Sequence, residues 1–189
     1  MPFAGEGTWI KGRTAVNNFS HVASGMLFIH SAPTALRSHI EWSAAAAVSL
    51  PGALAWEHQP VEAGSWCLET SWRGERARAT ELVSTLASWG RVRFELTIDA
   101  AAEGLDAGLG HRWSVTPSLG VFSADTSAIG DVMIDENRLR RAMVEARREG
   151  TDLQAEMADL LGEPWDVELE AYRARDPELD VSWLSSQVG

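Results

Sequence analysis

The chain has 189 residues, of which 16 are Lys or Arg and 27 are Asp or Glu, and its formal net charge is −11 at pH 7. This length suits one domain, or one domain with an appendage, and buries enough surface to fold without a disulfide or a structural metal. The acidic balance argues against nucleic acid and anionic membranes as partners, because both attract Lys and Arg. We expect a cytoplasmic protein, because the chain has a single cysteine, no long apolar run that could span a membrane and no apolar core of a signal peptide.

Residues 1–22 show neither a helical nor a strand period, and they mix glycine and asparagine with isolated apolar side chains. We interpret this segment as an extended arm. It is either a free terminus or an arm that lies on a partner or on its own domain, with Trp9 and Ile10 as anchors.

The hydrophobic pattern of residues 23–99 switches between strand and helix. Residues 24–31 are apolar on both faces, which is typical of a central strand covered on both sides. The strands and helices that follow are expected at 33–49 (helix), 53–59 and 65–73 (strands), 75–89 (helix) and 91–99 (strand). This β-α-β-β-α-β order is that of the ferredoxin-like unit, an antiparallel sheet with both helices on one face.

The chain beyond residue 100 predicts a loop, short strands and helices. Residues 103–110 are rich in glycine and predict a mobile loop, and short strands are expected near 112–116, 119–124 and 131–134. Asp135 is placed to cap a helix that ends at Gly150 and carries an apolar stripe of Leu139, Ala142, Met143 and Ala146. Thr151 and Gln154 have the spacing of a capping box for the next helix.

A last helix is expected to begin at Glu163, and Trp183 in the tail after it needs an apolar surface to dock on. Together these elements predict an α+β fold. It is a ferredoxin-like β-α-β-β-α-β sandwich extended by short strands and a C-terminal helical subdomain. The expected parts are an extended arm at 1–22, a sandwich core with an extra hairpin at 23–134, and a helical extension packed on the core at 135–189.

The charge is unevenly distributed. Residues 151–189 hold ten acidic and two basic residues, a net charge of −8. The helix expected after Asp135 is instead rich in arginine, and Arg138, Arg141 and Arg148 extend along one face of it. This face is either solvated and opposed to the acidic C-terminal helices, or a dock for an acidic or phosphate-bearing partner.

A polar cluster spans the end of the first strand and the start of the first helix: His30, Ser31, Arg37, His39 and Glu41. It is interpreted either as a helix cap with a buried hydrogen-bond network, or as a ligand-binding or catalytic group. The sequence contains no zinc-ligand spacing, nucleophile elbow or phosphate loop, so no metal, cofactor or catalytic residue is predicted. Cys67 lies in the middle of a strand, which favours a structural role.

Short motifs throughout the chain carry a family resemblance. Among them are His30-Ser-Ala-Pro33, His39-Ile-Glu-Trp42, Ser71-Trp-Arg-Gly74, Arg93-Phe-Glu-Leu-Thr97, Thr116-Pro-Ser-Leu-Gly120, Asp135-Glu-Asn-Arg-Leu139 and Leu160-Leu-Gly-Glu-Pro-Trp-Asp166. Over about residues 24–184 the sequence resembles an actinobacterial family, the domain of unknown function 3145. The resemblance implies a cytosolic protein and assigns no catalytic residue. Because some members are encoded beside type II fatty-acid synthesis genes, it also implies partners such as acyl-carrier protein, ketosynthase or acyl-CoA carboxylase.

Three functional hypotheses follow. The first is a non-catalytic accessory or regulatory module that binds a protein, with an enzyme of acyl-CoA or fatty-acid metabolism as the expected partner. The second is a small enzyme or acyl-CoA-binding protein that uses His30, His39 and Glu41. The third is homodimerisation through an open sheet face, whose outward residues would be Glu69, Ser71, Arg93 and Glu95.

Overall fold

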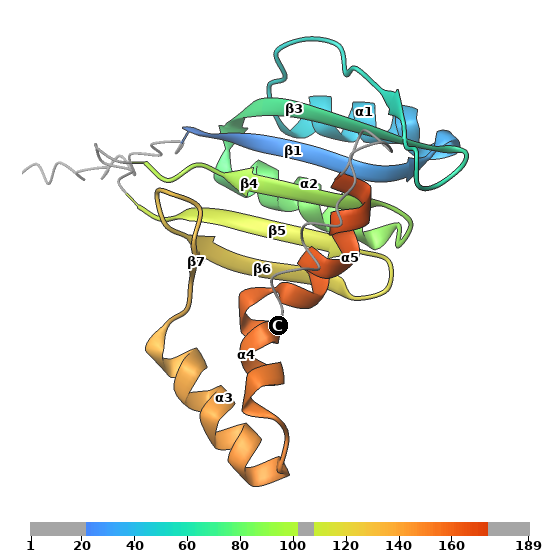
Figure 1. The fold of residues 1–189 in the computed structure, drawn as a ribbon. Coiled ribbons are helices and arrows are strands. Elements are labelled where there is room, and N and C mark those ends of the chain that lie inside the picture. Colours follow the sequence, from blue (N-terminus) through green and yellow to red (C-terminus); the bar gives the residue numbers. More distant parts are fainter. Residues whose placement is uncertain (1–21, 102–107, 174–189) are drawn as a thin grey trace, which may run out of the picture.

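The computed structural model describes residues 22–101 and 108–173, which form one antiparallel sheet with helices on both faces (Figure 1). The sheet has seven strands in the order β2-β3-β1-β4-β5-β6-β7. The strands are β1 (Val22–Pro33), β2 (Glu57–His58), β3 (Ser65–Glu75), β4 (Arg93–Ile98), β5 (Gly110–Thr116), β6 (Gly120–Thr126) and β7 (Val132–Met133). The helices are α1 (Arg37–Ala47), α2 (Arg76–Ser88), α3 (Glu136–Glu149), α4 (Leu153–Leu161) and α5 (Glu163–Arg173). The α+β class predicted from the sequence is confirmed.

The main core lies between the sheet and the helices α1 and α2, which cover the same face (Figure 1). Alternate residues of the central strands point into it, including Leu27 of β1 and Phe94 of β4, both fully buried. The stripe predicted for α2 is confirmed, since Ala79, Leu82, Val83 and Leu86 are all buried. Gly25 lets β1 pass close to β4, because a Cβ there would lie 1.8 Å from the carbonyl oxygen of Thr97.

The opposite face of the sheet is covered by α5, which contacts β1 and β5 (Figure 1). Leu169 of α5 is fully buried in this second interface, and Glu95 of β4 is only 7% exposed. The prediction that Glu95 faces solvent is therefore wrong. Alternation identifies the face on which a side chain lies, but it does not show that a helix some 70 residues later in the chain covers that face.

The helices α3 and α4 form a hairpin that stands away from the sheet (Figure 1). Asp135 caps α3 as predicted, accepting a hydrogen bond from the backbone N–H of Arg138 at 2.9 Å. The predicted capping box of α4 is wrong, because Asp152 is the N-cap and accepts from the N–H of Gln154 at 3.0 Å. The Thr151 hydroxyl lies instead 3.3 Å from the carboxylate of Glu156.

Other predicted segments differ in extent from the structure. The strand expected at 53–59 is reduced to the two residues of β2, since its neighbour β3 pairs only with Glu57 and His58 there. Trp9, Ile10, Trp183 and most of the glycine-rich loop lie outside the described residues, so what the sequence indicates for them remains a prediction. In the described part of the chain, no helix is long and apolar enough to cross a bilayer.

Candidate functional site

His30 lies at a β-bulge of β1, on the face that α5 covers, where its ring stacks on that of Phe28 two residues before it. The register of β1 shifts between Ile29 and Ala32 against β3, and between Ile29 and Ser31 against β4. His30 is buried, and its Nε2 lies 2.8 Å from the Glu95 carboxylate. The hydroxyl of the neighbouring Ser31 donates to the carboxylate of Glu62.

The other members of the predicted polar cluster lie elsewhere, on or beside α1. The guanidinium of Arg37 stacks over the ring of Trp66, with 4.0 Å between the guanidinium carbon and the ring centroid. Glu41 accepts a hydrogen bond from the indole N–H of Trp56 at 2.7 Å. His39 is exposed on α1 and meets the ring of Trp42 edge-on. Because α1 and α5 lie on opposite faces of the sheet (Figure 1), the structure does not bring His39 or Glu41 together with His30.

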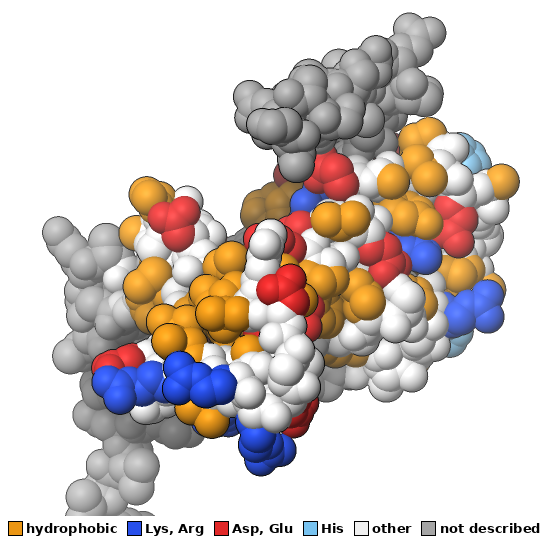
Figure 2. All heavy atoms as spheres, turned by 60° about the horizontal axis from the view of Figure 1, so that its bottom comes forward, with side chains coloured by type: hydrophobic (Ala, Val, Ile, Leu, Met, Phe, Trp, Pro, Cys, Tyr) orange, Lys and Arg blue, Asp and Glu red, His pale blue; other side chains and the backbone are white. Residues whose placement is uncertain are grey.

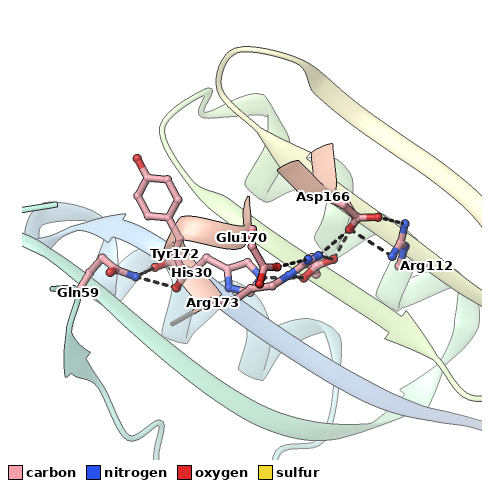
Figure 3. Close-up of polar contacts among 9 residues, drawn as sticks. His30, Gln59, Arg112, Asp166, Glu170, Tyr172 and Arg173 are labelled. Carbon is pink, nitrogen blue, oxygen red and sulfur yellow. Dashed lines mark hydrogen bonds and ion pairs between the residues drawn. The ribbon is translucent and has the colours of Figure 1, made fainter. Parts of the chain in front are cut away.

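Glu95 is the centre of a buried polar network that sequence reasoning missed, and two of its partners, His30 and Arg173, are labelled in Figure 3. Its carboxylate accepts hydrogen bonds from Arg173 of α5 at 2.8 Å and from the Ser114 hydroxyl of β5 at 3.0 Å, in addition to its contact with His30. Burial alone raises the pKa of Glu95. The hydrogen bonds from His30 and Arg173, together with the positive charge of Arg173, outweigh burial and lower the pKa to about 2. Glu95 is therefore ionised at neutral pH and ties α5 to the sheet.

Further ion pairs fasten α5 along its length. Arg112 of β5 makes a two-nitrogen contact with Asp166, at 3.1 and 3.4 Å (Figure 3). Arg93 of β4 contacts Glu168 at 3.2 Å and lies over the Tyr172 ring, with its guanidinium carbon 4.5 Å from the ring centroid. The acidic residues of α5 thus pair with arginines of the sheet. The sequence had instead suggested that they oppose the arginine-rich helix α3.

A cavity of about 340 Å³ lies beside this network, between β1, β3 and the C-terminal end of α5. Phe28, Cys67 and Tyr172 are among its walls, and Glu95 and Arg173 are among its polar groups. Cys67 is buried, lines the cavity together with His30, and has its Sγ 3.9 Å from the carbonyl oxygen of His58. No cluster of three or more potential metal ligands occurs within residues 22–101 and 108–173.

The arginines predicted to bind a partner lie on α3. Arg138 and Arg141 line a groove of about 260 Å³ together with Glu156 and Asp159 of α4. Arg148 is exposed and forms an ion pair with its neighbour Glu149, at 3.3 Å. No ion pair of 4.0 Å or less joins α3 to α4 in the described residues, although the two helices pack together.

The apolar stripe of α3 is only partly buried. Ala142 and Ala146 are buried against the rest of the protein, whereas Met143 is 50% exposed and Val144 is 64% exposed. The prediction that Met143 belongs to the buried stripe is therefore wrong in part: the two alanines are buried, Leu139 is half-buried and Met143 is exposed. In the sequence, the small size of these two alanines was the signal that α3 buries little side-chain volume.

Comparison with known proteins yields a single family. The model of the family described as "Protein of unknown function (DUF3145)" matches residues 26–186. No curated protein and no solved structure gives a significant match.

Proposed function

The chain belongs to the DUF3145 family, and we propose that it is a non-catalytic accessory or regulatory module that binds another protein. The observation that carries this proposal is the apolar surface of the α3–α4 hairpin. Met143, Val144 and Leu153 are 50%, 64% and 42% exposed, on an element that stands away from the sheet. Figure 2 turns this end of the molecule forward, and hydrophobic side chains gather there beside Lys or Arg side chains.

Packing within the chain does not account for this surface. Every buried apolar side chain of α3 is an alanine, so the helix buries little apolar area against its own domain. α4 has no fully buried residue, and the hairpin reaches the body mainly through its contact with α5. Exposed apolar side chains bordered by charged ones are typical of surfaces that bind a protein.

As the partner we propose an enzyme of acyl-CoA or fatty-acid metabolism, namely an acyl-CoA carboxylase or a component of type II fatty-acid synthesis. The gene context implied by the family resemblance supports this class. The arginines of α3 add support, because acidic carrier proteins would complement them. We also propose a cytoplasmic location, which suits the single cysteine of the chain.

The finer description of the fold is likewise a proposal. We propose that the first four strands with α1 and α2 form a ferredoxin-like unit. The strand order β2-β3-β1-β4, with every neighbouring pair antiparallel and both helices on one face, supports it.

The alternative of a ligand-binding protein is favoured by one observation, the cavity of about 340 Å³ beside Tyr172 and Arg173. It would use His30 but not His39 or Glu41, which lie on the other side of the sheet. The polar groups that the cavity offers are already engaged, since His30 and Arg173 both contact Glu95. For this reason protein binding is the function we put first.

Affinity purification of the tagged full-length chain from its source organism tests the proposal. The test compares the unchanged chain with the double variant M143Q/V144Q, which removes apolar surface while keeping charge and helix propensity. W42A is the matched control, because Trp42 is 68% exposed on α1, away from the hairpin. We expect a stoichiometric partner that is lost with M143Q/V144Q and kept with W42A. Recovery of the bare chain alone, or equal capture by all three proteins, would contradict the proposal.

A further inference from the structure

The outward side of α3 has a specific arrangement of charge around one apolar side chain. Residues three and four positions apart are neighbours on a helix surface. The four such neighbours of Val144 are all arginines: Arg140 and Arg141 one turn before it, and Arg147 and Arg148 one turn after it. We call these five residues the arginine face.

The arginine face is exposed, and its charges are weakly engaged. All four arginines and Val144 are exposed. Arg140 contacts Glu136 and Arg148 contacts Glu149, both through exposed ion pairs within α3. Such exposed pairs are weak and are readily exchanged for other partners. Arg141 and Arg147 have no ion pair of 4.0 Å or less among the described residues.

We propose that the arginine face binds an acidic amphipathic helix of the partner protein, with an apolar side chain of that helix on Val144 and carboxylates around it. This inference rests on the proposed function and names the chemistry of its partner. Charge complementarity carries it, because the face concentrates four positive charges on a chain whose net charge is −11. α3 has 14 residues and is about 21 Å long, which matches a helix of ordinary length.

Other occupants fit the arginine face less well. A second copy of the chain that paired its α3 with this α3 would bring four arginines against four arginines, and such like-charge contacts are costly. A nucleic acid would meet the arginines with phosphates, yet it would leave Val144 and Met143 without apolar contact and would be repelled by the net charge of the chain. Of these candidates, an acidic protein helix alone satisfies both the charges and the apolar centre.

Two designed peptides supply the probe. Both are amphipathic helices with the same leucine stripe, and one carries glutamates and the other lysines along the stripe. Binding of each to the full-length chain is measured by fluorescence anisotropy at low salt and at about 1 M salt, where the screening length is about 3 Å. We expect the chain to bind the acidic peptide and not the basic one, and to lose at least about tenfold in affinity at high salt.

Charge reversal then locates the site. R141E/R147E should weaken the acidic peptide at least about tenfold and bind the basic peptide in its place. The matched control is R76E/R78E, which changes two exposed arginines of α2 and alters the net charge by the same amount. Far-ultraviolet circular dichroism checks that each variant keeps its helices. Equal binding of both peptides, equal effects of the two double variants, or binding of duplex DNA or of a second copy in place of the acidic peptide would overturn the inference.

Failure of the inference and failure of the proposed function can be told apart. If R141E/R147E still captures the partner that M143Q/V144Q loses, the hairpin binds a protein but not through its arginines, and only the inference is overturned. If no partner is captured by the unchanged chain, the proposed function fails, whatever the peptides do.

Discussion

Replacing Glu95 by glutamine tests whether a buried carboxylate holds α5 against the sheet. The substitution keeps the size of the side chain and removes the charge that Arg173 and His30 meet. Because the pKa of Glu95 is about 2 in the folded chain and 4.5 ordinarily, the unfolded chain binds the proton more tightly. The ionised carboxylate therefore stabilises the fold fully above about pH 5, and this stabilisation is lost as the pH falls toward 2.

The size of the effect follows from the pKa difference. Each pKa unit corresponds to about 1.4 kcal/mol, so the charge of Glu95 contributes about 3 kcal/mol to the free energy of unfolding at pH 7. We expect E95Q to lower that free energy by about this amount at pH 7, and by less than half as much at pH 3. Little is lost to solvent screening, because Glu95 is only 7% exposed.

Urea denaturation of the full-length chain and of E95Q, at several pH values between 7 and 3, measures this difference. The control is E81Q, which removes a carboxylate that is paired with Arg78 on the surface of α2 and should change the free energy of unfolding by less than about 0.5 kcal/mol. A loss of under about 1 kcal/mol for E95Q at pH 7, or the same loss at pH 7 and pH 3, would refute the reasoning.

Two further predictions concern the ends of α3 and α4 and are tested by the same urea denaturation experiment. Gly162 has a φ of 83°, and an added Cβ would lie 2.7 Å from the Phe122 ring. We therefore expect G162A to lower the free energy of unfolding by at least about 2 kcal/mol. Gly150 has a φ of 69° but open space around it, so G150A should cost only about 1 kcal/mol, and equal losses would show that the ring contact is unimportant. D152A should lower the free energy of unfolding by about 1 kcal/mol through loss of the N-cap, and T151A should lower it by less than half as much. A larger loss for T151A than for D152A would show that Thr151 is the cap.

The secondary structure of the first half could be predicted because burial on a single face determines it. Alternation in β4 and the i, i+3, i+4, i+7 spacing in α2 follow directly from packing between sheet and helices. The N-cap of α4 was harder to assign, since Thr151 and Asp152 are adjacent and both can accept from the first turn. The choice between them depends on backbone geometry that the residue types do not encode.

The buried network could not be predicted, for a physical reason. His30, Glu95 and Arg173 come from segments that are 65 and 78 residues apart, and they meet because β1 lies beside β4 and α5 folds back over both. In the sequence, a charged residue at an alternate strand position indicates solvent. Only the matching arginines of β4 and β5 and the acidic residues of α5 could have suggested a covered face.

The measurement that tests the central claim most directly is hydrogen exchange of the captured complex, compared with that of the free chain. If the α3–α4 hairpin is the binding surface, amides of residues 136–161 should exchange more slowly in the complex, while those of α1 and α2 stay unchanged. Slower exchange confined to the sheet or to α1, with the hairpin unaffected, would contradict the account.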